Sequence, residues 1–183
     1  MENKTPFMTE IPEQEPQRQQ YFMAHAKEQL HILEENLGRP LTCCINTFGC
    51  QMNARDSEKL LGILETIGYQ AVETEDADFV LYNTCTVREN ANLRVYGRLG
   101  QLGARKKKHP HMMIALCGCM MQEKEVVEKI KKTYRFVDLI FGTHNIFKLA
   151  ELVSLCLEER LEELEAQGRE DKKPKHKMVV DVW

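Results

Sequence analysis

The chain has 183 residues, a net charge of −3 at pH 7, 43% apolar residues and 29% charged residues. This size suits one domain with its own hydrophobic core and additional segments at its ends. The negative net charge excludes a protein that attracts nucleic acid through an overall positive potential. No apolar run is long enough for a membrane span, and the first residues lack the apolar core of a signal peptide. Seven cysteines, an odd number, then favour a reducing compartment, in which clustered thiols more often bind metals than form disulfides. We therefore expect a cytoplasmic protein.

The two ends of the chain differ in composition from its middle. Residues 1–18 are polar and contain three prolines, so we expect a disordered tail. Apolar residues at helical spacing predict an N-terminal helix within 19–40, ended by Gly38. We interpret 41–167 as one domain and 168–183 as a linker to a further domain, because a charged stretch there leads into a short apolar run.

The middle of the chain alternates between strand and helix patterns. Strands are expected at 41–46, 69–72, 79–82, 112–116 and 136–141, and helices at 53–67, 86–107, 122–134 and 146–165. Asn53 is expected to cap one helix and the capping-box pattern of 86–89 to start the next. The alternation predicts a three-layer α/β fold, with a mostly parallel five-stranded sheet and helices on both faces. In the flavodoxin-like strand order 2-1-3-4-5, the first, third and fourth strands are neighbours.

Cysteine recurs at the same point of three successive strand–turn–helix units. Cys50, Cys85 and Cys119 each follow one of those three strands, and they are separated by 35 and 34 residues. The carboxyl ends of neighbouring parallel strands meet at one edge of a sheet, where α/β proteins bind their ligands. The topology therefore predicts that the three thiols form one site.

Several kinds of site could contain three thiols. The turn that ends in Cys50 is not a Ser-, Thr- and Gly-rich phosphate cradle, so a flavin is not expected, and no Walker or dinucleotide glycine pattern occurs. A structural zinc site has four ligands, usually in close pairs, and only Cys117 or His144 could be a fourth. Cubane iron–sulfur clusters are bound by thiolates, and three protein thiolates would leave one iron open. We favour such a cluster, with helix N-termini stabilising the thiolates, and keep a zinc-binding or interaction module without catalysis as the alternative. A thiol oxidoreductase is disfavoured because no Cys-x-x-Cys pair occurs.

Three motifs around these cysteines resemble a known family. The sequences Thr47-Phe-Gly-Cys-Gln-Met-Asn53, Asn83-Thr-Cys-Thr-Val-Arg-Glu-Asn-Ala91 and Cys117-Gly-Cys-Met-Met-Gln122 are similar to the N-terminal domain of the radical SAM methylthiotransferases, most closely to its tRNA-modifying branch. The resemblance covers roughly residues 41–152, and weakly 178–183.

The resemblance implies a role for the three cysteines. Cys50, Cys85 and Cys119 would bind an auxiliary [4Fe-4S] cluster that supplies sulfur, with a sulfur donor at the open iron. The whole enzyme would add a methylthio group to C2 of N(6)-isopentenyladenosine beside the anticodon of tRNA. It would also use S-adenosyl-L-methionine and a second [4Fe-4S] cluster.

The chain departs from the family in what it lacks. No cysteines have the Cys-x-x-x-Cys-x-x-Cys spacing that binds the SAM-cleaving cluster, and the C-terminal RNA-binding module is missing. We therefore expect this chain alone to be inactive in tRNA modification.

The remaining thiols and charges have simpler interpretations. Cys43, Cys44 and Cys156 are expected in the core as small apolar side chains. Cys117 is either core or a substitute ligand. The basic run 105–108 is expected to be a solvated helix end, with a phosphate contact as the secondary possibility.

Overall fold

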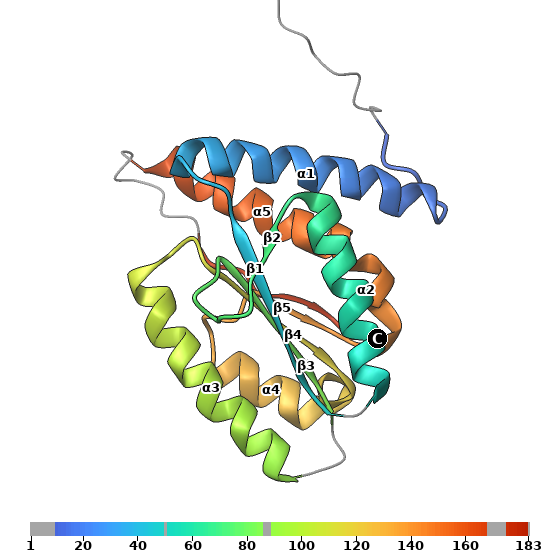
Figure 1. Ribbon diagram of the computed structural model, residues 1–183, viewed down its shortest axis with the longest axis vertical. Coiled ribbons are helices and arrows are strands. Elements are labelled where there is room, and N and C mark those ends of the chain that lie inside the picture. Colours follow the sequence, from blue (N-terminus) through green and yellow to red (C-terminus); the bar gives the residue numbers. More distant parts are fainter. Residues whose placement is uncertain (1–9, 50, 86–88, 168–174, 183) are drawn as a thin grey trace, which may run out of the picture.

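A computed structural model describes residues 10–49, 51–85, 89–167 and 175–182 (Figure 1). The helices are α1 (Gln17–Leu37), α2 (Gln51–Ile67), α3 (Glu89–Lys108), α4 (Lys124–Thr133) and α5 (Leu149–Ala166), with short 3₁₀ helices η1 (Cys119–Gln122) and η2 (Thr143–Lys148). The strands are β1 (Thr42–Phe48), β2 (Gln70–Ala71), β3 (Phe79–Thr84), β4 (Met113–Gly118), β5 (Leu139–Phe141) and β6 (Val179–Asp181).

All the strands pair in parallel, in the order β2-β1-β3-β4-β5-β6. The predicted α/β architecture and the N-terminal helix are confirmed. The prediction of five strands is corrected to six, because residues 179–181 pair with β5 as β6. The sequence pattern of 178–183 is strand-like, but it did not reveal this pairing, since a run of three strand residues gains its hydrogen bonds only from a distant partner.

Helices cover both faces of the sheet, in agreement with the prediction. Every residue of β3 and of β4 is buried, as expected for central strands of a parallel sheet. The apolar residues of α1, α2 and α5 pack on one face, and those of α3 and α4 pack on the other. In Figure 1, α1 lies along α5 on the outside of the first group, so the N-terminal helix covers helices rather than the sheet.

Helix starts differ in detail from the predictions. The helix expected from residue 53 begins at Gln51, so Asn53 is not an N-cap and is buried inside the first turn of α2. The capping-box residues 86–88 lie outside the described part of the chain. A short 3₁₀ helix precedes each of α4 and α5, because the chain turns tightly as it leaves β4 and β5.

Asp78 joins three strands at the edge of the sheet where the strands begin. Its carboxylate accepts hydrogen bonds from the backbone N–H of Thr42 (2.9 Å) and from Arg39 (2.7 and 2.8 Å). Its backbone N–H donates to the carbonyl of Thr42, and its carbonyl accepts from Met113, the first residue of β4. Burial opposes ionisation, but the hydrogen bonds from Arg39, His111 and Thr42 outweigh it and hold the pKa of Asp78 well below its usual range.

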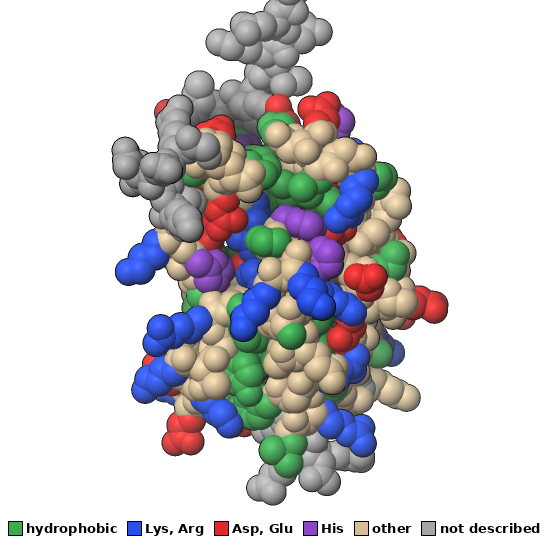
Figure 2. Space-filling view, turned by 90° about the vertical axis from the view of Figure 1, so that its left-hand side faces the viewer, with side chains coloured by type: hydrophobic (Ala, Val, Ile, Leu, Met, Phe, Trp, Pro, Cys, Tyr) green, Lys and Arg blue, Asp and Glu red, His purple; other side chains and the backbone are tan. Residues whose placement is uncertain are grey.

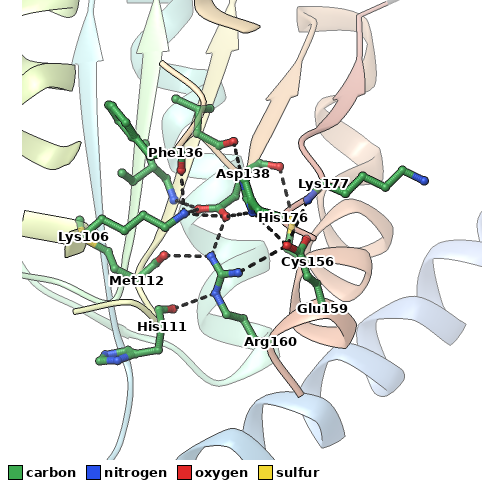
Figure 3. A network of polar contacts seen from close by, with 12 residues as sticks. Lys106, His111, Met112, Phe136, Asp138, Cys156, Glu159, Arg160, His176 and Lys177 are labelled. Carbon is green, nitrogen blue, oxygen red and sulfur yellow. Dashed lines mark hydrogen bonds and ion pairs between the residues drawn. The ribbon is translucent and has the colours of Figure 1, made fainter. Parts of the chain in front are cut away.

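Asp138 has the matching position at the start of β5. Its carboxylate accepts from the backbone N–H of Ile114 (2.8 Å), and ion pairs with Lys106 (2.8 Å) and Arg160 (2.6 Å) neutralise it (Figure 3). Because Asp138 and Arg160 are almost fully buried, the loss of the Asp138 carboxylate would leave two cations without their shared partner. Two carboxylates therefore tie neighbouring strands together at this edge.

Within the described ranges, every helix is too short or too polar to serve as a membrane span.

The pKa of Asp78 predicts how stability changes in acid. Because its folded pKa lies below that of the unfolded chain, its contribution is present above about pH 4 and is lost as the pH falls below that value. We expect Asp78→Asn to lower the free energy of unfolding by about 2–4 kcal/mol at pH 7, and the difference from wild type to shrink below pH 4. Urea unfolding at pH 7 and pH 3.5 measures this. The matched control is Asp76→Asn, an exposed carboxylate nearby, and a difference that is equal at both pH values would contradict the assignment.

Candidate metal centre

The strands β1, β3 and β4 end side by side. Phe48 of β1 is level with Thr84 of β3, and Thr84 is level with Gly118 of β4. Cys85 directly follows Thr84, and Cys119 directly follows Gly118, so the register alone places these two thiols on adjacent chain segments. Cys50 is two residues beyond Phe48 and lies outside the described residues.

Two glycines let the turns at this edge approach one another closely. Gly49, directly before Cys50, has a φ of 151°, and a Cβ placed on it would lie 2.5 Å from the Cβ of Cys85. Gly118 has a φ of 102°, and a Cβ there would lie 2.0 Å from the carbonyl oxygen of Thr84. Both positions therefore exclude a side chain. The backbone before Cys50 touches Cys85, and the backbone before Cys119 touches the residue before Cys85.

A buried pair of amides fixes the start of α2 against the end of β3. The Asn53 amide donates to Asn83 Oδ1 (3.2 Å) and to the carbonyl of Thr84 (3.1 Å). The Asn83 amide donates in return to the carbonyl of Asn53 (2.8 Å) and to Ser57 Oγ (3.1 Å). Asn83 also lies beside Gly118, because its Oδ1 would be 2.9 Å from a Cβ placed on that glycine. The pair thus fixes the first turn of α2 against the end of β3, a role that the sequence did not reveal. The one feature of the sequence that could have indicated this role is an asparagine, Asn83, within an otherwise largely apolar strand.

The two described thiols at this edge differ in exposure. Cys85 is 6% exposed, whereas Cys119 is partly exposed at the start of η1. The described residues, to which Cys50 does not belong, contain no group of three potential metal ligands. The structure thus brings Cys85 and Cys119 to one edge, with Gly49 against Cys85. The three-cysteine metal site stays a prediction.

The other cysteines are in the core. Burial raises the pKa of Cys43 to about 12, and it also raises the pKa of Cys44 and of Cys156 above the ordinary thiol value. Cys117 is 0% exposed and packs among the apolar residues beneath α2 and α5. Burial raises its pKa well above the ordinary value. These environments favour neutral thiols. Cys117 is fully buried among apolar side chains and therefore belongs to the core.

Nearby side chains divide between the core and the rim. Met120 and Met121 are fully buried under α3 and α4, whereas Met52, in the first turn of α2, is 75% exposed. His144 is exposed and lines a groove of about 650 Å³ between α2 and η2, together with Phe147. The arrangement at the edge is therefore two described thiols in a setting of glycine backbone, amides and apolar side chains.

Comparison with known proteins gives a consistent picture. Residues 42–142 match the model of the uncharacterized protein family UPF0004. The chain is similar to proteins named "tRNA-2-methylthio-N(6)-dimethylallyladenosine synthase" in Lachnoclostridium phytofermentans (63% identity, 88% of this chain, 32% of the relative) and Acetivibrio thermocellus (50% identity, 94% of this chain, 33% of the relative). A protein of the same name in Clostridioides difficile is 44% identical over 94% of this chain and 33% of the relative. The chain thus spans about a third of the length of these relatives.

The backbone at Gly118 predicts a large effect of a single methyl group. We expect Gly118→Ala to lower the free energy of unfolding by more than about 2 kcal/mol, because the added Cβ meets the Thr84 carbonyl in a left-handed conformation. Gly97→Ala is the matched control. Gly97 is an exposed glycine inside α3 with nothing within 4 Å of its Cβ, so this change should stabilise by about 0.5–1 kcal/mol. Urea unfolding of both variants tests the turn geometry, and equal effects would disprove it.

Burial predicts an order of thiol reactivity. At pH 8, in native buffer without metal, we expect iodoacetamide to modify Cys119 at least about ten times faster than Cys43, Cys117 or Cys156, since only thiolates react and burial raises the pKa of those three thiols. Peptide mass spectrometry over time gives the rates, and labelling in urea should remove the differences. If Cys117 reacts as fast as Cys119, its place in the core is wrong.

Proposed function

The chain belongs to the UPF0004 family, and from that premise we propose that it is the sulfur-supplying, [4Fe-4S]-binding domain of a tRNA methylthiotransferase. One observation carries the proposal. The ends of β1, β3 and β4 lie level, so that Cys85, Cys119 and the turn that leads into Cys50 converge on one edge. The names of the relatives supply the chemical class of the substrate, a tRNA adenosine, and of the group that is added.

The chain's residues fit a three-thiolate cluster. Cys50, Cys85 and Cys119 would bind the irons as thiolates, and α2 begins directly after Cys50. The positive end of its dipole would therefore lower the cost of a thiolate there. Gly49 and Gly118 keep side chains out of the space between the turns. When bound, such a cluster supplies an open iron to which a sulfur species can attach.

Other residues of this edge would orient and enclose the site. The Asn53–Asn83 pair holds the first turn of α2 against β3, and so fixes the chain on the C-terminal side of Cys50. Met120 and Met121, which follow Cys119 in the chain, are fully buried in the core cluster of α3 and α4 and would limit the access of water from that side. In this proposal the sulfur ends up on C2 of N(6)-isopentenyladenosine beside the anticodon of tRNA, in the cytoplasm.

The same edge fits a contact with the rest of a longer protein. Three of its large apolar side chains are exposed, namely Met52 (75%), Leu93 (70%) and Phe147 (50%). The strand β6 also ends at this edge, where the amide of Asn145 donates to the carbonyl of Asp181 (3.0 Å). We propose that the domain of residues 41–167 presents its thiols to a second domain that binds S-adenosyl-L-methionine and another [4Fe-4S] cluster, and that residues 168–183 lead toward it.

Anaerobic reconstitution with iron and sulfide tests the proposal. We expect about four irons per chain and broad visible absorption that bleaches on reduction. Cys50→Ala, Cys85→Ala and Cys119→Ala should each abolish stable binding, whereas the control variants Cys43→Ala and Cys156→Ala, at buried core thiols, should bind iron as wild type does. Circular dichroism confirms that each variant is folded.

Two outcomes would contradict the assignment. Four irons retained in Cys85→Ala would show that the ligand set is wrong. Tight, colourless zinc binding without iron would favour the zinc-binding or interaction module instead.

A further inference from the structure

The basic run at the end of α3 is more than a solvated helix end. Residues 94–108 contain six Arg and Lys residues and no Asp or Glu, in a chain whose net charge is −3. The last turn of α3 lies beside the end of α4 and the segment that leads into β6, and Lys106, Lys131 and Lys175 line one hollow of about 600 Å³. The helix dipole explains cations at the end of α3 but does not explain why cations from three separate elements converge.

The cations of this region fall into two layers. In the inner layer, Lys106 and Arg160 are paired with the buried carboxylate of Asp138, so their charge serves the fold (Figure 3). The outer layer is made of Lys107, Lys131, Arg135 and Lys175, all exposed, and we call these four residues the basic patch. Figure 2 looks onto this side of the molecule and shows Lys and Arg side chains spread across it.

The basic patch has little compensating charge. Lys131 has an exposed ion pair with Glu128 (3.0 Å), of the kind that contributes little. Among the described residues, Lys107, Arg135 and Lys175 have no ion pair. Glu163 is the one acidic side chain that lines the hollow, and it lies within 3.5 Å of the buried Arg160. Lys131, Arg135 and Lys175 line this hollow, and Lys107 lines the neighbouring one. Together these exposed cations create a local positive potential that attracts an anionic ligand.

We propose that the basic patch binds the phosphate backbone of an RNA helix. The patch lies at a distance from the sheet edge that carries Cys85 and Cys119, which we call the thiol edge. The identity of the ligand as RNA rests on the proposed function, while its location rests on the charges. The helix α3 has 20 residues and is therefore about 30 Å long, and it runs from the thiol edge to the basic patch. A duplex of roughly ten base pairs spans the same length. A stem adjoining the modified loop would thus contact the basic patch while the loop lies at the thiols.

The outer face of α3 leaves room for that approach. Gly97 and Gly100 are exposed on it and have nothing within 4 Å of a Cβ, so no contact within the chain requires glycine at either position. Ala104 and Lys107 continue the exposed face toward the patch. Small side chains along the helix let a backbone as wide as that of RNA come close before it meets the cations.

Binding of a fluorescent tRNA transcript to the 183-residue chain tests the proposal. We expect Lys107→Glu and Arg135→Glu each to weaken binding by about fivefold to tenfold, the double variant by more than about twentyfold, and each lost contact to lower the slope of log affinity against log salt by about 0.7–0.9. Lys27→Glu is the matched control, because it makes the same charge change at an exposed position of α1, on the other face of the sheet. It should change affinity less than twofold.

The outcomes separate this proposal from the function proposed above. An equal loss of tRNA affinity in Lys27→Glu and Arg135→Glu would contradict the proposal that the basic patch binds RNA. The absence of tRNA binding at 50 mM salt would contradict it as well. Competition by inorganic pyrophosphate as strong as by tRNA would assign the hollow to a small phosphate ligand and would also overturn it. Iron reconstitution is measured independently, so a chain that binds iron without RNA, or RNA without iron, identifies which proposal fails.

Discussion

The parallel register of β1, β3 and β4 is the constraint on which the rest of this molecule depends. Two buried carboxylates stabilise it where the strands begin. Asp78 binds the first N–H of β1 with its side chain and receives the first N–H of β4 with its carbonyl, and Asp138 binds Ile114 of β4. A strand that slipped by one residue would break these bonds and turn every core side chain to the other face. Because the register is fixed at one end, the three strands end level at the other.

Because the strand ends are level, backbone contacts shape the candidate metal centre as much as side chains do. Gly49 and Gly118 bring the turns within contact of Cys85 and Thr84, and the Asn53–Asn83 pair anchors the first turn of α2. In the proposed function Cys85 and Cys119 are therefore brought to one edge by the fold before metal arrives, and less ordering free energy opposes cluster binding. The two edges of the sheet are therefore linked. The hydrogen bonds at the edge where the strands begin fix their register, and this register aligns the strand ends at the opposite edge.

The two proposed ligands would bind at opposite ends of α3. The thiols lie near its first residues, and the basic patch lies beside its last. The ion pairs of Asp138 with Lys106 and Arg160 neutralise the core below the patch and leave the outer cations exposed. One carboxylate thus serves both the strand register and the surface charge, since it holds α3, β5 and α5 together at the base of the hollow.

The sequence by itself determined the α/β alternation and the position of each candidate cysteine after a strand, because burial on both faces and helical periodicity leave a direct imprint on local composition. The strand order was expected only by analogy with the flavodoxin-like topology. It also separated Cys43, Cys44 and Cys156 from the candidate ligands. Only the tertiary structure decided the rest. Cys117 belongs to the core, Asn53 bonds back to β3 instead of capping α2, residues 179–181 form a sixth strand, and Asp78 and Asp138 clamp the sheet. Each of these depends on partners distant in sequence, and a hydrogen bond or ion pair between distant residues has no local pattern from which it could be predicted.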